Sequence, residues 1–174
     1  MHLLFDIYDA TGETKKQIDI ADKLVFQGQT QYYDKMKALY GENWESEYPA
    51  IRARYKTSPV YMYILNAEHD WLLLLNEVTQ SPSTVFQYGR ALAEYSPEVV
   101  FDIYKLEIVR AAAEASDRHG YKKICASIRE LNSAGGTQEA LKLIDEFAEK
   151  YKRRPAMIDE LNTLRHKLTK KTGE

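Results

Sequence analysis

The sequence predicts an all-α fold made of stacked antiparallel helical hairpins, an arrangement of the α-solenoid type. Three observations lead to this prediction. Leu, Ala, Lys and Glu are abundant, whereas a chain of 174 residues contains only 8 glycines and 5 prolines, and this composition is typical of helices. Apolar residues recur at spacings of three and four, which places them on one helix face. Short polar turns separate these segments, so each helix should lie antiparallel to the one before it.

Glycine, serine and proline residues indicate, in chain order, where the helices end and begin. Residues 9–14, DATGET, read as the end of one helix and the start of the next. Glycine adopts the left-handed conformation that often follows a helix, and serine followed by proline suits a helix start. The expected glycine ends are Gly28, Gly41 and the pair Gly135 and Gly136. The expected starts are Ser58 with Pro59, Ser83 within residues 81–84, Ser96 with Pro97, and a first turn at Pro155.

The apolar spacing assigns a buried face to the clearest helices among about ten that we expect in all. The longest helix is expected in residues 98–115, and two further helices in residues 138–151 and 155–168. The predicted buried stripes of these three segments are Val99, Ile103, Leu106, Val109 and Ala113; Ala140, Ile144, Phe147 and Tyr151; and Ile158, Leu161, Leu164 and Leu168.

Length and composition suit a single domain that covers residues 1–174, with possible subdivisions near residues 57–59 and 117–120. Hydrophobic residues make up 44% of the chain and charged residues 29%, which allows a packed core under a solvated surface. The tetratricopeptide (TPR) pattern is met in the eight-residue spacing of Phe147 and Pro155, but not at its small-residue positions. We therefore expect a TPR-like superhelix without a strict repeat.

Charge is unevenly distributed along the chain, although the net charge is only −2. Residues 59–117 contain 3 basic and 9 acidic side chains, and residues 118–174 contain 13 basic and 8 acidic side chains. A dedicated DNA-binding domain is usually basic throughout, so the overall balance argues against that class. The basic C-terminal third could still contact nucleic acid, an acidic protein, or the acidic middle of another copy.

The residue types that carry catalysis or bind metals are not grouped in any recognisable pattern. Cys125 is the single cysteine, which excludes an intramolecular disulfide and an all-cysteine zinc site, and its helical context predicts a buried side chain. The four histidines lie in different hairpins or near a terminus, without a second His or Cys three or four residues away. No zinc-protease, phosphate-loop or nucleophile-elbow motif is present. We therefore expect no catalytic residue, metal or cofactor, and a protein that is not an enzyme.

The sequence gives no sign of membrane association. Its first residues lack the basic region of a signal peptide, and the longest apolar run, WLLLL, is too short to span a bilayer. We expect a cytoplasmic protein.

A run of basic residues near the C-terminus is the most site-like segment of the chain. Lys150, Lys152, Arg153 and Arg154 directly precede Pro155. Cations in the last turn of a helix complement the negative end of its dipole, so the run has an ordinary structural explanation. The alternatives are contact with an acidic protein or with the phosphates of a nucleic acid.

Aromatic residues provide a second set of candidate contacts. The chain contains 13 tyrosines, and packing between helices is the ordinary role of such side chains. The alternative is that Tyr61, Tyr63 and Trp71 line a groove for a partner peptide, because aromatic residues are enriched at protein interfaces.

Two long segments carry a resemblance to a known family. Residues 121–161 contain a helix that starts with tyrosine, a glycine turn, a second helix and the sequence RRPAMIDEL. Residues 2–51 contain a TGE turn, the helix GQTQYYDKMK and the step WESEYP. Together, and in the order in which they occur within each segment, these pieces resemble the C-terminal helical region of bacterial SWIM zinc-finger proteins. The zinc finger itself needs cysteine and histidine ligands that this chain lacks, so the resemblance implies the helical region alone.

These observations favour a non-enzymatic helical scaffold that binds a protein partner. The alternative is an auxiliary nucleic-acid-binding domain that uses the basic C-terminal third. We expect the two to differ in salt dependence, because phosphate contacts weaken steeply as salt rises.

Overall fold

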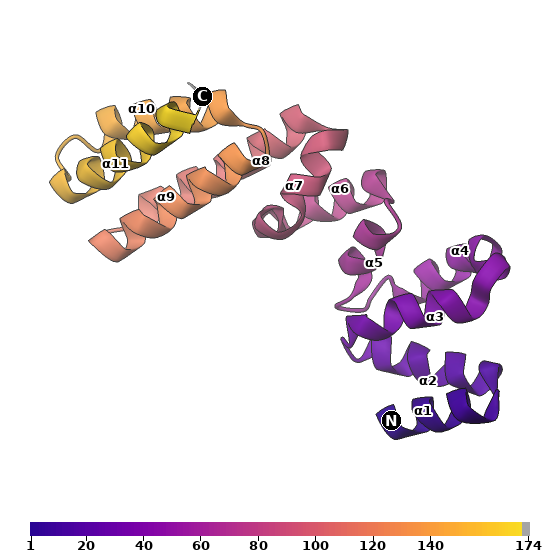
Figure 1. Ribbon diagram of the computed structural model, residues 1–174. Coiled ribbons are helices and arrows are strands. Elements are labelled where there is room, and N and C mark those ends of the chain that lie inside the picture. Colours follow the sequence, from indigo (N-terminus) through magenta and orange to yellow (C-terminus); the bar gives the residue numbers. More distant parts are fainter. Residues whose placement is uncertain (172–174) are drawn as a thin grey trace. The chain divides into compact units, whose positions relative to one another are not determined.

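A computed structural model describes residues 1–171, and within them the protein is all-α without a strand (Figure 1). The predicted fold class is confirmed at this level. The described residues also contain three short 3-10 helices, at Thr30–Tyr32, Gly41–Asn43 and Pro82–Thr84. The eleven α-helices within residues 1–171 are α1 (His2–Thr11), α2 (Thr14–Phe26), α3 (Tyr33–Tyr40), α4 (Trp44–Tyr55), α5 (Tyr61–Ala67), α6 (Trp71–Gln80), α7 (Val85–Tyr95), α8 (Pro97–Glu114), α9 (Arg118–Ser133), α10 (Thr137–Lys150) and α11 (Pro155–Lys171).

The helices form two compact units. The first comprises Met1–Leu73, and the second begins at Leu74, within α6. The subdivisions expected near residues 57–59 and 117–120 fall before α5 and at the start of α9. That the chain folds as a single domain stays a prediction.

In the first unit, α1 packs on α2, α2 on α3, and α4 on α5. Tyrosine rings contribute to this core, since Tyr33 and Tyr55 are fully buried, as are Leu24 and Met36. The Tyr55 hydroxyl donates a hydrogen bond to the Asp22 carboxylate at 2.7 Å. The ring is therefore removed from water while its polar end stays bonded, which is the packing role expected for tyrosine.

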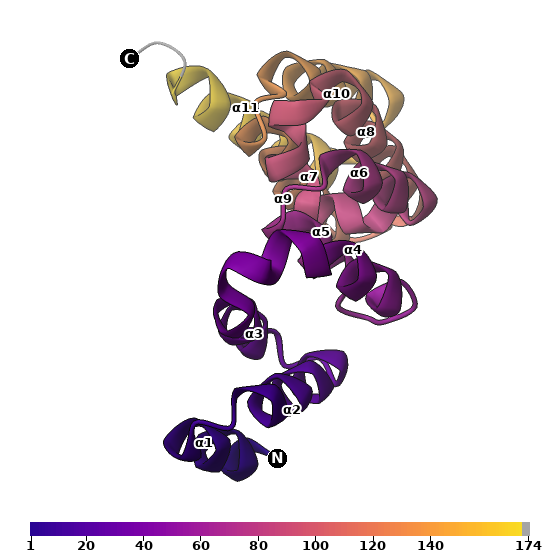
Figure 2. The same cartoon turned by 90° about the vertical axis from the view of Figure 1, so that its right-hand side faces the viewer.

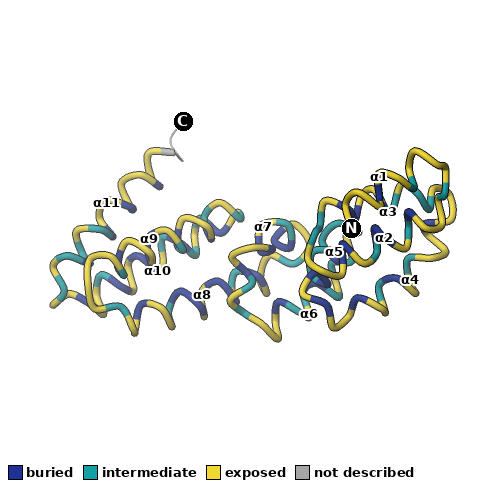
Figure 3. Tube along the Cα trace, turned by 90° about the horizontal axis from the view of Figure 1, so that it is seen from below, coloured by how far each residue is buried: buried dark blue, intermediate teal, exposed yellow. Residues whose placement is uncertain are grey.

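In the second unit, each helix from α7 to α11 packs on the next, and α7, α8 and α9 also contact the helix after next. The helices α9, α10 and α11 lie side by side at the C-terminal end (Figures 1 and 2). Buried positions recur about once per turn along these helices (Figure 3). The core of the unit therefore runs along the helix stack.

The buried face agrees with the sequence for α10 and for most of α11, where Met157 is buried in place of the expected Ile158, but it differs for most of α8. Val99 and Leu106 were expected inside, but they are 43% and 59% exposed. Ile103 is buried as expected, but the other large buried apolar residues of α8 are Val100, Tyr104 and Ile108, one or two positions from the expected stripe. The apolar residues of α8 itself lie on several sides of the helix, so their spacing alone could not show which side packs against other helices.

Most of the expected helix ends are confirmed. Gly135 has a left-handed φ of 101° and follows α9. Gly136 does not, since its φ of −80° places it at the N-cap of α10. The other confirmed ends and starts are Gly28 after α2, Gly41 after α3, Ser96 with Pro97 at the start of α8, and Pro155 at the start of α11.

Two expected starts lie further along the chain. Ser58 precedes a turn, and its Oγ accepts a hydrogen bond from the Val60 N–H at 3.3 Å before α5 begins at Tyr61. Ser83 lies inside a 3-10 helix, and α7 begins at Val85. A 3-10 turn at a helix N-terminus is common, and it moves the first α-helical residue downstream.

Candidate functional site

The most distinctive surface of the second unit is a groove between α9 and α11. Residues of α9 at spacings of three and four share one helix face, and so do residues of α11. Because α9 packs against α11, the two faces flank a common space. The residues of this α9–α11 groove are Lys122, Cys125, Arg129, Asn132 and Ser133 from α9, and Glu160, Thr163, Leu164, Lys167, Leu168 and Lys170 from α11.

The groove consists of two adjoining hollows. The first, with a volume of about 210 Å³, is lined by residues between Lys122 and Arg129 on α9 and between Glu160 and Lys167 on α11. The second, of about 370 Å³, extends to Ser133 and Lys170. Arg129 and Lys167 line both hollows, so the hollows adjoin along the two helices, and together we call them the groove.

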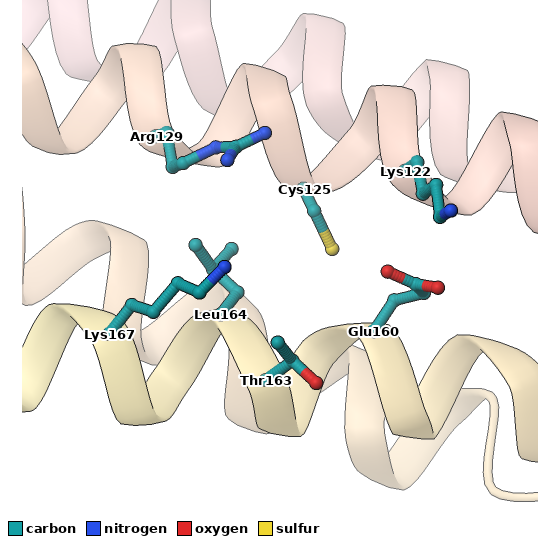
Figure 4. Close-up of a pocket in the computed structure, with 7 residues that line it drawn as sticks. All are labelled: Lys122, Cys125, Arg129, Glu160, Thr163, Leu164 and Lys167. Atoms are coloured by element: carbon teal, nitrogen blue, oxygen red, sulfur yellow. The ribbon is translucent and has the colours of Figure 1, made fainter.

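Figure 4 shows the first hollow, with side chains from both helices directed into the gap. The Cys125 thiol points from α9 toward α11, and Lys122 extends toward Glu160 at one end. Arg129 and Lys167 approach the gap from opposite helices at the other end. This second end continues into the second hollow.

Four cations line the groove, and none of them forms an ion pair with another residue among residues 1–171. Two other arginines of α9 and α11 do form ion pairs. Arg118 pairs with Asp159 and Glu160, and Arg165 pairs with Asp145. The neighbouring carboxylates of Asp145 and Asp159 are thus bound to cations outside the groove. The four unpaired cations are Lys122, Arg129, Lys167 and Lys170.

The groove keeps a positive charge after its own acidic groups are counted. Glu160 is its single carboxylate, and this carboxylate also lies 3.3 Å from the Arg118 guanidinium. The C-terminal ends of α9 and α11, near Ser133 and Lys170, each contribute a partial negative charge of about half a unit. These charges offset roughly half of the four cations, so the groove can accept an anionic ligand.

Cys125 lies in the floor of the groove and is a structural side chain. It is only 6% exposed. Burial, together with the Glu160 carboxylate, raises the pKa of its thiol to about 11, and the Arg129 guanidinium opposes the change. At neutral pH the thiol is protonated and therefore a poor nucleophile. The expectation of a buried cysteine is confirmed.

The predicted basic run lies outside this groove, at the end of α10, and much of it is bound locally. Lys152 pairs with Glu149 at 2.7 Å, and the Lys150 ammonium lies 5.4 Å from the centre of the Tyr151 ring. Arg153 is exposed. These positions suit a solvated helix end.

Arg154 has a structural role that the sequence did not indicate. Its guanidinium donates a hydrogen bond to the Ala115 carbonyl at 2.8 Å, and it lies 4.7 Å from the centre of the buried Tyr151 ring. The side chain thus ties the α10–α11 turn to the α8–α9 turn. An Arg154 substitution would change this packing as well as the surface charge.

The three predicted aromatic contacts lie in α5 and at the first residue of α6, within the first unit. Tyr61 is 8% exposed. Tyr63 is partly exposed and meets the Tyr33 ring edge-on at 6.0 Å. Trp71 stacks on His69 with ring centres 4.9 Å apart. Their role in binding a partner peptide stays a prediction.

Two carboxylates in the α5–α6 turn are held by side chains of α3 and α4. Glu68 accepts hydrogen bonds from the Tyr33 hydroxyl at 3.1 Å and the Trp44 indole at 3.0 Å, and it pairs with Lys37 at 2.9 Å. Asp70 accepts from the Tyr48 hydroxyl and pairs with Arg52 at 3.0 Å. Both carboxylates are occupied by protein donors, so this polar cluster holds the turn in place.

Neither the groove nor this cluster was predicted from the sequence. The groove combines residues about 40 positions apart, and the contact of α9 with the helix after next cannot be seen in local periodicity. A signal was present in the spacing of Lys122 and Arg129 by seven residues and of Lys167 and Lys170 by three, which puts each pair on one helix face.

The described part of the chain shows neither a metal-site cluster nor a membrane-spanning helix. Residues 1–171 contain no group of three or more His, Cys, Asp or Glu side chains placed to hold a metal ion. None of the helices described is both long and apolar enough to cross a bilayer.

Comparison with known proteins gave no match to a family model, to a curated protein or to a solved structure.

Proposed function

We propose that this protein is a non-enzymatic helical scaffold that binds an acidic segment of a partner protein in the α9–α11 groove. The observation that carries the proposal is the set of four groove cations without an ion-pair partner among residues 1–171. All four side chains are exposed, so water and salt reduce their mutual repulsion, and an acidic ligand would reduce it further. Acidic segments of proteins supply carboxylates that match lysine and arginine.

The lining of the groove favours a peptide over a nucleic acid. The eleven lining residues include leucine, cysteine and threonine but no aromatic side chain. Single-stranded nucleic acids are usually held by aromatic rings on which bases stack. An extended peptide instead needs apolar contacts and donors for its carboxylates, and both are present here.

We also propose that the helices stack as an α-solenoid of the TPR-like type. The pattern of contacts in the second unit, in which α7, α8 and α9 each meet the next helix and the one after it, supports this arrangement. Solenoids expose long surfaces between successive helices, and these surfaces commonly bind peptides. Kinship with the helical region of SWIM zinc-finger proteins rests on the sequence pieces alone and stays a proposal.

The test compares partner recovery by two variants of equal net charge. Arg129→Gln with Lys167→Gln removes two groove cations, whereas Lys123→Gln with Arg153→Gln removes two exposed cations outside the groove. Each protein is used to recover partners from lysate treated with nuclease. We expect a protein recovered by the wild type and the control variant but not by the groove variant. Equal recovery by both variants would contradict binding in the groove.

A second candidate function is auxiliary nucleic-acid binding, which the excess of basic residues in 118–174 favours. It predicts that partners are no longer recovered from lysate after treatment with nuclease. It also predicts that the affinity of the protein for a DNA duplex falls steeply as the salt concentration rises. The groove variant is better suited to this test than Lys150→Glu, Arg153→Glu and Arg154→Glu together, because Arg154 also holds the fold. Binding of duplex DNA that does not change with salt would exclude this function.

A further inference from the structure

We propose that the partner bound in the α9–α11 groove is a second copy of this chain, which docks its helix α1 there. This inference rests on the proposed function, and it names the acidic segment that the groove binds. The contact joins α1 of one copy to the groove of the next.

The outer face of α1 is apolar and exposed. Among the residues of α1, all of which the structure describes, Phe5 alone is buried. Leu3, Leu4 and Ile7 are 72%, 41% and 44% exposed. Ile7 lies four residues after Leu3 and three after Leu4, so the three side chains form one surface, which we call the α1 patch. A contiguous apolar patch is typical of a surface that binds another protein.

The acidic charge of α1 favours the groove over a second α1 as the docking surface. Asp6 is exposed and follows Leu3 by three residues, which places it at the edge of the α1 patch. Because α1 contains no lysine or arginine, two α1 helices placed face to face would bring like charges together. The groove has four cations and a single carboxylate, that of Glu160. Opposite charges therefore favour docking of α1 in the groove.

The exposed apolar residues of α8 fit the groove less well. Val99 and Leu106 are 43% and 59% exposed. The same face of α8 carries Arg110 as well as Asp102, both exposed. This face therefore lacks the excess of acidic charge that α1 has.

The groove and α1 match in length and in apolar character. The ten residues of α1 extend over about 15 Å, and the groove runs about 17 Å along α9, from Lys122 to Ser133. The buried residues Leu164 and Leu168 lie in the floor of the groove, and the carbon stems of lysine and arginine side chains extend this apolar surface. An amphipathic helix that lays its apolar face in such a groove is a common mode of recognition. In this pose the α1 patch faces the floor, and Asp6 lies near a cation of the rim.

The experiment measures the mass of the full chain by sedimentation equilibrium as the protein concentration rises. Each copy carries both an α1 helix and a groove, so docking is head-to-tail and can continue from copy to copy. We expect the average mass at high concentration to reach about twice that of one chain or more. The mass should fall again as added salt screens the charges.

Two variants separate the two sides of the contact. Leu3→Lys with Asp6→Lys changes two exposed residues of α1, and Arg129→Gln with Lys167→Gln changes two exposed cations of the groove. Circular dichroism checks that both variants are folded. Each variant alone should keep the mass of a single chain. Their equal mixture should form a dimer and nothing larger, because the intact α1 of the groove variant fits the intact groove of the α1 variant.

The matched control, Lys123→Gln with Arg153→Gln, removes two exposed cations outside the groove and should associate like the wild type. Association of the groove variant but not of the α1 variant would show that α1 pairs with another α1, and it would overturn the inference. A wild-type chain that stays single at every concentration, or a mixture of the two variants without a dimer, would overturn it as well.

The proposed function is judged separately, by binding of an all-glutamate peptide. Peptide binding by the wild type and the control variant but not by the groove variant would retain the groove as a site for acidic segments even if the chain does not associate with itself. A chain that neither associates nor binds the peptide would reject the proposed function together with this inference.

Discussion

His69 is the one residue other than glycine with a positive φ among residues 1–171, at 59°. It follows the end of α5, where the Asp70 N–H bonds to the Leu65 carbonyl at 2.9 Å and the His69 N–H to the Asn66 carbonyl at 3.3 Å. Glycine usually occupies this left-handed position after a helix. Here the histidine ring is exposed and stacks on Trp71.

The left-handed backbone of His69 predicts an unusual order of stability for two substitutions. His69→Gly relieves the backbone, whereas His69→Ala loses the same ring and keeps the strain. We expect His69→Gly to be more stable than His69→Ala by about 1 kcal/mol in urea unfolding. At the exposed helical position Lys123 the order should reverse by a similar amount, because glycine is the poorer helix former. The same order at both positions would contradict the assigned backbone.

Gly89 of α7 permits a close approach to Tyr104 of α8. A Cβ atom at Gly89 would lie 2.6 Å from the Tyr104 ring, and that ring is only 2% exposed. We expect Gly89→Ala to destabilise the protein by about 1–3 kcal/mol, although alanine is the better helix former. In a Tyr104→Ala background the penalty should vanish or reverse, as a double-mutant cycle would detect. An equal penalty in both backgrounds would rule out this contact.

The buried thiol of Cys125 predicts a loss of stability at alkaline pH. Burial raises its pKa from 9.0 to about 11, so the folded state holds the proton more tightly than the unfolded state does. The resulting stabilisation is fully present below pH 9 and is lost as pH rises through 11. The free energy of unfolding of the wild type should therefore fall relative to that of Cys125→Ala over this range. Parallel curves for the two proteins would show that the thiol is not buried as described.

At the scale of elements, the turns are tied to each other by single side chains. Arg154 bonds the Ala115 carbonyl of the α8–α9 turn and covers the Tyr151 ring, whereas its neighbour Arg153 is exposed. We expect Arg154→Ala to lower the free energy of unfolding by about 1–2 kcal/mol, since a charged hydrogen bond is lost. Arg153→Ala is the matched control and should change it by less than about 0.5 kcal/mol. Equal effects of the two substitutions would argue against the tether.

The presence of the helices and most of their ends could be predicted from the sequence. The buried face of each helix could be predicted only in part. In α10 the apolar residues lie on one side, and Ala140, Ile144 and Phe147 are buried as expected. In α8 apolar residues lie on several sides, and only Ile103 of the expected buried stripe was assigned correctly. The candidate site escaped prediction because it depends on the contact between α9 and α11, whereas the conspicuous run at residues 150–154 is a helix end with local partners.

At the scale of the whole molecule, the structure shows where basic residues of the C-terminal third of the sequence lie. Residues 118–174 contain 13 basic and 8 acidic side chains, and some of the basic ones form ion pairs within this segment, as Arg118 and Arg165 do. What is left unpaired within the described residues includes the four cations of the α9–α11 groove. The central claim is that this groove, and not the basic run at the end of α10, is the binding surface.

The most direct test is a nuclear magnetic resonance titration of the ¹⁵N-labelled chain with an all-glutamate peptide at low salt. Amide shifts should concentrate in residues 122–133 of α9 and 160–170 of α11, and they should weaken as salt screens the charges. The corresponding shifts should be lost in the Arg129→Gln, Lys167→Gln variant. Shifts centred on residues 150–154, or spread evenly over the exposed lysines and arginines, would contradict the account.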